Sequence, residues 1–67
     1  MQSKGKDFIK MNFEKGYLAA ADLQNADLRQ TDLIGANLQN ADLTNANLTE
    51  ANLRGAKLSN SIDITYK

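Results

Sequence analysis

The chain has 67 residues, which is enough for one small domain at most. Its residues are 42% hydrophobic and 6% aromatic, so folding would bury only about 60% of the unfolded surface, and stability would need a regular scaffold or a partner. The chain has no Cys and no His, which excludes disulfides, thiol and imidazole catalysis and the usual transition-metal ligands. Lys and Arg total 8 and Asp and Glu total 8, and this zero net charge provides no general attraction to nucleic acid or to an anionic membrane.

Residues 1–12 are predicted to form a Lys-containing leader followed by an N-terminal cap. They lack the apolar stretch of a signal peptide. No apolar run in the chain approaches the roughly 20 residues that span a bilayer. We therefore expect a cytoplasmic protein that makes no membrane contact.

A repeat of five residues dominates the segment 13–60, which is predicted to be the folded domain. From position 21 onward, Ala stands two residues before each Leu with Thr31 as the exception, and Asp or Asn stands one residue before each Leu until Lys57. The unit is therefore Ala-(Asp/Asn)-Leu-x-x. Every Leu lies on one lattice, and two Phe residues extend it upstream: Phe8, Phe13, Leu18, Leu23, Leu28, Leu33, Leu38, Leu43, Leu48, Leu53 and Leu58.

Neither common secondary structure accommodates this period. On an α-helix, five residues turn the chain by about 500°, so successive leucines step about 140° round the axis and form no single apolar face. On a straight strand, side chains alternate between the two faces, and an odd spacing would direct every other Leu into water. A chain that bends by the same amount every five residues keeps all of them on one axis, and the sequence therefore predicts a solenoid.

The segments ADLQN, ADLRQ, TDLIG, ANLQN, ADLTN, ANLTE and ANLRG resemble members of the pentapeptide repeat family, over Gly16–Asn60. The resemblance implies an all-β fold, the right-handed quadrilateral parallel β-helix, with about two and a half to three coils. Each pentapeptide would form one side of a square, and residues twenty apart would stack at about 4.8 Å. The leucines and the two Phe side chains would then fill the interior as the structural core, and the Ala side chains would lie inside near the corners.

The residues around the Leu positions lead to further expectations. Asp and Asn beside each Leu face water and are expected to bond to the nearby backbone and stabilise the turn. Amides twenty apart, such as Asn25 and Asn45, are expected to form ladders. Thr31 is expected to direct its hydroxyl to a backbone carbonyl.

Two further positions depart from the unit. Gly35 and Gly55 lie twenty apart, and they are interpreted as relief for a turn rather than as a place where a partner's backbone approaches. Met11 fits an Ala position poorly, which predicts an irregular first coil.

Residues 61–67 change from a period of five to a period of two. Asp63 falls where the next Leu belongs, and Ile62, Ile64 and Tyr66 alternate with polar residues, which reads as a short strand. These three apolar side chains can cover the last coil within the chain or pair with a second copy. We expect, by a small margin, a homodimer through this end of the solenoid.

No catalytic, cofactor or metal site is predicted, and we expect a protein that is not an enzyme. Calcium-binding β-helix repeats are nine residues long and Gly-rich, unlike this unit. The predicted function is a non-enzymatic structural or protein-interaction module with an unknown protein partner. The alternative is a DNA mimic that modulates a type II topoisomerase such as DNA gyrase, which the resemblance also implies. That alternative needs a long acidic surface, whereas residues 17–60 carry five acids and three bases.

Overall fold

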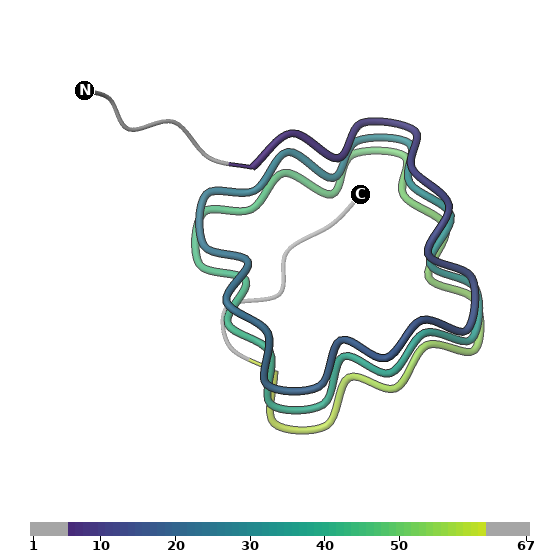
Figure 1. Cartoon of the computed structure of the whole chain (residues 1–67), viewed down its shortest axis with the longest axis vertical. Helices are drawn as coiled ribbons and strands as arrows, with labels where there is room; N and C mark the ends of the chain where they lie inside the picture. The colour runs from purple at the N-terminus through teal and green to yellow at the C-terminus, as the bar shows by residue number, and fades with distance from the viewer. Residues whose placement is uncertain (1–5, 62–67) are drawn as a thin grey trace.

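The computed structural model describes residues 6–61 as successive coils that lie one on another (Figure 1). Viewed along the stack, each coil has a four-cornered outline, and the coils overlie one another closely. This part of the chain contains no helix and no extended strand. It is held by isolated parallel bridges between residues twenty apart: Asp7–Asp27, Asn12–Asp32, Tyr17–Asn37, Asp22–Asp42, Asp27–Asn47, Asp32–Asn52 and Asn37–Lys57. The predicted twenty-residue register is therefore present.

A β-turn follows every core side chain and makes the corner. In each turn the carbonyl of the core residue accepts a hydrogen bond from the N–H three residues later, as Leu38 does from Ala41 at 3.1 Å. The third turn residue always has a positive φ, between 58° and 72°. A positive φ at this position alone is the signature of a type II turn. Because the turn recurs every five residues, four turns return the chain to a position above its starting point.

Neighbouring coils are joined by backbone hydrogen bonds of 2.7–3.0 Å. On one side, for example, Leu18 N–H donates to Asn37 O, and Asn37 N–H donates to Gly16 O. The next bond on that side joins Ala20 N–H to Gln39 O. This pattern satisfies the backbone groups that a middle coil directs toward its neighbours.

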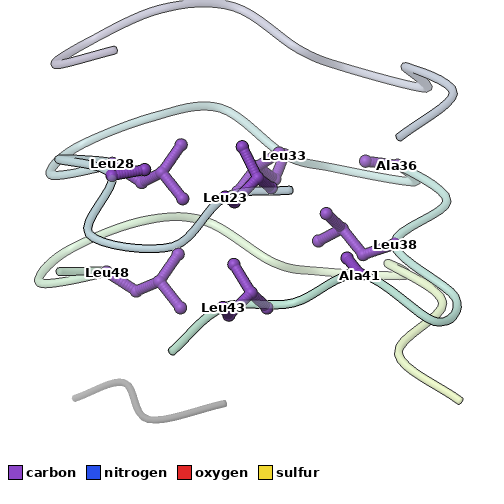
Figure 2. Close-up of a cluster of buried hydrophobic side chains, with 9 residues drawn as sticks. Leu23, Leu28, Leu33, Ala36, Leu38, Ala41, Leu43 and Leu48 are labelled. Atoms are coloured by element: carbon purple, nitrogen blue, oxygen red, sulfur yellow. The ribbon is translucent and has the colours of Figure 1, made fainter. Parts of the chain in front are cut away.

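The interior holds the Leu lattice. Leu23, Leu28, Leu33, Leu38, Leu43 and Leu48 are buried, together with Ala26, Ala36 and Ala41. Figure 2 shows Leu28 over Leu48 and Leu23 over Leu43, with the side chains directed into the coil. Leu18, Leu53 and Leu58 belong to the end coils and are partly buried against this core. Removal of so much apolar surface from water is the main stabilising term for the fold.

The N-terminal end of the stack is covered by Phe8 and Phe13. Their rings meet edge to face, with centroids 5.5 Å apart and an interplanar angle of 81°, and both rings pack against the core. This is a favourable aromatic geometry. The two side chains thus occupy the interior lattice positions at this end.

The expectation of an irregular first coil is wrong. Met11 N–H bonds to Phe8 O at 3.0 Å, and Met11 O accepts from Asp32 N–H at 2.9 Å, as at every other Ala position with a coil below it. The Met11 side chain is 46% exposed. Since no described coil lies above it, this flexible side chain extends outward without disturbing the backbone. The regular winding accordingly begins at Asp7, before the predicted start of the repeat domain at residue 13.

Thr31 behaves as the sequence predicts. Its side chain is 1% exposed, and its hydroxyl donates to Leu28 O at 2.8 Å. The same carbonyl also accepts the Thr31 N–H at 3.2 Å, so the polar side chain adds a bond without changing the turn. Ser61 stands where the repeat would place an Ala, three residues after Leu58, and its hydroxyl donates the corresponding bond to Leu58 O at 2.8 Å.

Candidate interaction surfaces

Within residues 6–61, the candidates for function are the outward side chains, because the interior is filled by Leu, Ala and Thr31. No pocket is present on the part of the chain that the structure describes. No group of three or more Asp or Glu side chains within residues 6–61 is close enough to hold a metal ion. The same residues contain no helix that is long and apolar enough to cross a membrane.

At nine of the eleven positions directly before a core side chain, the residue is an Asp or Asn with a structural task. Its Oδ1 accepts a hydrogen bond from the backbone N–H two residues later, at distances of 2.9–3.3 Å. This is an Asx turn, which orders the corner and satisfies a backbone donor. The acceptors are Asp7, Asn12, Asp22, Asp27, Asp32, Asn37, Asp42, Asn47 and Asn52. The Asp and Asn side chains at this one repeat position are thus bound to their own backbone.

Two corners gain an additional side-chain bond. Thr44 and Thr49 donate their hydroxyls to Asp42 and Asn47, each at 2.6 Å. Asp22 and Asp42 are stacked neighbours of like charge, as the register predicts, and both remain bound to the backbone of their turns.

One side of the stack, composed of residues 6–10, 26–30 and 46–50, carries an ion pair. Arg29 donates two hydrogen bonds to the Asp27 carboxylate, from Nε at 2.8 Å and from a terminal nitrogen at 2.7 Å. These bonds lower the pKa of Asp27, and the same carboxylate raises the pKa of Arg29. Gln30 also donates to Glu50 of the next coil at 2.9 Å. Asp27 and Arg29 are the one ion pair on this side within the described residues.

The turn positions explain the glycines and the stacked amides. Gly35 and Gly55 lie one above the other with φ of +69° and +72°, so they serve the left-handed corner as predicted. Asn25 and Asn45 have φ of 63° and 62° at the equivalent corner, where Asn tolerates left-handed backbone well. No hydrogen bond joins their two amides within the described residues, and the expected ladder is not formed.

Tyr17 and Lys57 are the exceptions among the residues that precede a core side chain, and the structure places them in one column. Tyr17 pairs with Asn37, and Asn37 pairs with Lys57. Tyr17 is 80% exposed, which makes it the most exposed large hydrophobic side chain of the described residues. We name the side composed of residues 16–20, 36–40 and 56–60 the Tyr17 face. Lys57 is visible in the sequence as a break in the repeat, whereas Tyr17 lies upstream of position 21, where the Ala-(Asp/Asn)-Leu pattern becomes regular.

The predicted contact residues Ile62, Ile64 and Tyr66 lie outside the described residues. Leu53 and Leu58, the last two core residues of the described part, are partly buried.

Comparison with known proteins is consistent with the geometry. A family model described as pentapeptide repeats matches in eight copies, over residues 12–49 and 21–60. The chain therefore belongs to the pentapeptide repeat family. Among solved structures it is similar to a pentapeptide repeat protein, Rfr23, from the cyanobacterium Cyanothece 51142. The identity is 30% over 84% of this chain and 48% of that one, with a TM-score of 0.35. This chain thus spans about half the length of that protein. The comparison with curated proteins gave no match.

Proposed function

We propose that this chain is a non-enzymatic protein-interaction module whose coils form the right-handed quadrilateral parallel β-helix, with about two and a half to three coils. One observation carries the proposal. Every Asp side chain of residues 6–61 is bound in an Asx turn, and a closely spaced ion pair holds Asp27 and Arg29. What the chain offers to other molecules is a set of sides with fixed backbone and short side chains. Its cytoplasmic location stays a prediction.

Family membership supports this function, because repeat solenoids commonly present extended surfaces to partners. The DNA-mimic alternative requires a long, continuous acidic surface, and the described chain favours it less. Asp27 is neutralised by Arg29, and Lys6 Nζ donates to Asp22 O at 3.0 Å beside the acidic corner of Asp22. The contact predicted at the C-terminal end, through Ile62, Ile64 and Tyr66, also stays a prediction.

Capture from an extract of the native host tests the proposed function. The parent chain and a Leu38→Asp variant are immobilised on separate matrices, and the retained proteins are identified by mass spectrometry. Leu38 is fully buried, and an unpaired charge there costs several kcal/mol against a small total stability, so the variant is expected to be unfolded. The proposal predicts a protein that the folded parent retains and the variant does not.

Two results would count against the proposal. The first is that no protein is retained specifically by the parent. The second is retention of DNA gyrase together with stoichiometric inhibition of its supercoiling activity, which would favour the DNA-mimic alternative.

A further inference from the structure

Tyr17 and Lys57 occupy positions where the fold calls for a different side chain. At nine of the eleven corresponding positions an Asp or Asn accepts the N–H two residues later. Tyr and Lys cannot accept that bond. The N–H groups of Ala19 and Ser59 consequently have no hydrogen-bond partner among residues 6–61. Both exceptions lie on the same side of the stack, at either end of one column with Asn37 between them.

The Tyr17 face also differs from the other sides in charge. Its three segments are Gly-Tyr-Leu-Ala-Ala, Ala-Asn-Leu-Gln-Asn and Ala-Lys-Leu-Ser-Asn, which contain no carboxylate and one charge, Lys57. Every other side carries at least two acids among residues 6–61. Depletion of charge around an exposed aromatic side chain is typical of the centre of a protein interface. Within the described residues, Lys57 makes no ion pair and Tyr17 has no aromatic neighbour.

We propose that the Tyr17 face binds the Tyr17 face of a second copy of this chain. The column is self-complementary, because its two ends carry a cation and an aromatic ring. The two-fold axis lies between the two faces, at the level of Asn37 and parallel to the chain on this side. Rotation about this axis reverses the order of the column in the second copy. Tyr17 then faces Lys57 of the second copy, and the same contact occurs twice, as a two-fold axis requires. Each contact is a cation–π interaction between Lys and Tyr.

The other two-fold arrangement of the same faces is less favourable. An axis parallel to the stack of coils would place Tyr17 on Tyr17 and Lys57 on Lys57. That arrangement brings two like charges together with no carboxylate on either face to compensate them. The charge pattern of the column therefore selects the arrangement in which the two stacks run in opposite directions.

The size of the face sets the strength of the contact. The whole chain has 4230 Å² of accessible surface, so one of four sides supplies at most about 1000 Å², and stable interfaces bury about 800 Å² per partner. Since a real contact covers only part of a side, this association belongs to the weak and reversible class. It should appear at high protein concentration and disappear on dilution.

Exchange of the two side chains tests the arrangement. The full chain, the single variants Tyr17→Lys and Lys57→Tyr, and the double variant carrying both changes are diluted from millimolar to micromolar concentration. Self-association is followed by concentration-dependent amide shifts in NMR spectra and by sedimentation. Tyr17→Lys opposes two ammonium groups and should weaken association roughly tenfold or more. Lys57→Tyr replaces each cation–π contact with an aromatic pair of similar strength and should change the association much less. The double variant restores both contacts and should return to the parent's affinity.

Matched controls come from the neighbouring side. Asn12→Lys and Asn52→Tyr introduce the same side chains at the same repeat position, away from the Tyr17 face. Each removes one Asx hydrogen bond and lowers stability, but the folded variants should associate as the parent does. The three exchange variants break no Asx hydrogen bond, because neither Tyr17 nor Lys57 makes one. A difference in their association therefore does not come from the loss of such a bond. The dilution shifts should centre on Tyr17, Asn37 and Lys57, whereas an end contact would centre on the last coil.

Two results would overturn the inference. One is a parent chain whose Tyr17-face amides do not shift between micromolar and millimolar concentration. The other is a double variant that associates no better than Tyr17→Lys. The inference goes beyond the proposed function, because a chain that does not pair with itself through this face can still bind a different protein. A negative result in the host-extract capture would contradict only the proposed function, and a negative result in the dilution series would contradict only the self-association.

Discussion

Two residues after each core side chain, the backbone adopts a left-handed conformation, and nine of the residues that do so are not Gly. For most L-amino acids this conformation costs about 1–2 kcal/mol, because Cβ approaches the following carbonyl oxygen. Asn tolerates it, whereas Ala20, Lys10 and Gln30 gain nothing locally from it. The turn and inter-coil bonds, such as Ala20 N–H to Gln39 O at 2.8 Å, hold these residues in place.

Replacement of Ala20 by Gly should therefore stabilise the chain. The change removes the cost of the left-handed conformation, although Gly loses more conformational entropy on folding than Ala does. The free energy of unfolding should rise by about 0.5–1 kcal/mol, or several degrees in Tm. The matched control is Ala19→Gly, one residue earlier, where φ is not positive and Gly should lower stability by about 0.5–1 kcal/mol. Thermal unfolding followed by circular dichroism measures both. A loss of stability in both variants would contradict the turn geometry.

The Asp27–Arg29 pair makes stability depend on pH. Hydrogen bonds from Arg29 lower the pKa of Asp27 in the folded chain. A carboxyl group with a depressed folded-state pKa stabilises the fold above its unfolded pKa, about 3.9, and loses this contribution as pH falls through the folded value. Because both side chains are exposed to solvent, the contribution is small and sensitive to salt.

The control for this pair is Asp27→Asn, which keeps the Oδ1 acceptor for Arg29 N–H but removes the charge. The parent should melt slightly above this variant at pH 7, and the difference should shrink as the pH falls through the lowered pKa of folded Asp27. Melting curves at pH 7, 5, 4 and 2.5 in low salt provide the measurement. A difference that stays constant over this range would mean that the ion pair does not stabilise the fold.

Each five-residue element repeats one corner, and the identity of the residue before the core side chain decides how well that corner is satisfied. At Asn52, Oδ1 accepts from Arg54 N–H at 3.1 Å. At Lys57, one corner further along the chain, the equivalent Ser59 N–H has no acceptor among the described residues. The two elements thus differ by one hydrogen bond in otherwise similar surroundings.

This difference predicts opposite effects for two exchanges. Lys57→Asn should raise the free energy of unfolding by about 0.5–1.5 kcal/mol, because it supplies the missing acceptor. Asn52→Lys should lower it by a similar amount. Urea unfolding at low micromolar concentration, where the weak face-to-face contact is absent, measures both. If the two variants shift in the same direction, the Asx bond is not what distinguishes these corners.

The interior could be predicted from the sequence because a period of five fits neither a straight helix nor a straight strand. Leu38 and its lattice neighbours could reach a common axis only in a chain that bends at every repeat. The fit of Met11 was judged by the size of its side chain, whereas the structure shows that an open end tolerates it. The left-handed corners at Lys10 and Gln30 had no Gly to reveal them.

The Tyr17 face was not visible in the linear sequence for a different reason. Tyr17 and Lys57 are forty residues apart, and their relation depends on the twenty-residue register through Asn37. Extending the Asp/Asn position upstream of residue 21 would have shown that Asp7 and Asn12 fit it and that Tyr17 does not. That observation identifies the exception, and only the coil register shows that the two exceptions share a side.

At the scale of the whole molecule, a short stack has a high proportion of ends to sides. At the N-terminal end Phe8 and Phe13 pack against the core. At the other end, Leu53 and Leu58 are only partly buried by residues 6–61, and the N–H groups of Leu53, Gly55 and Leu58 have no backbone partner within that range. Exposed edges of this kind invite pairing unless they are covered.

Truncation after Asn60 tests the role predicted for Ile62, Ile64 and Tyr66. Loss of these side chains should lower Tm, because less apolar surface is removed from water at the last coil. Light scattering at micromolar concentration should show a dimer for the full chain and a monomer for the shortened one if the segment joins two copies end to end. A monomer mass in both cases, with only Tm reduced, would make the segment a cap within the chain.

The central claim is the register that places residues twenty apart side by side, and NMR cross-peaks between protons test it most directly. We predict contacts between neighbouring coils for the bridged pairs, with Asn37 close to both Tyr17 and Lys57. The regular three- and four-residue contacts of a helix should be missing from residues 6–61. A spectrum with continuous helical contacts across the leucine lattice, and none between residues twenty apart, would contradict the fold and every surface derived from it.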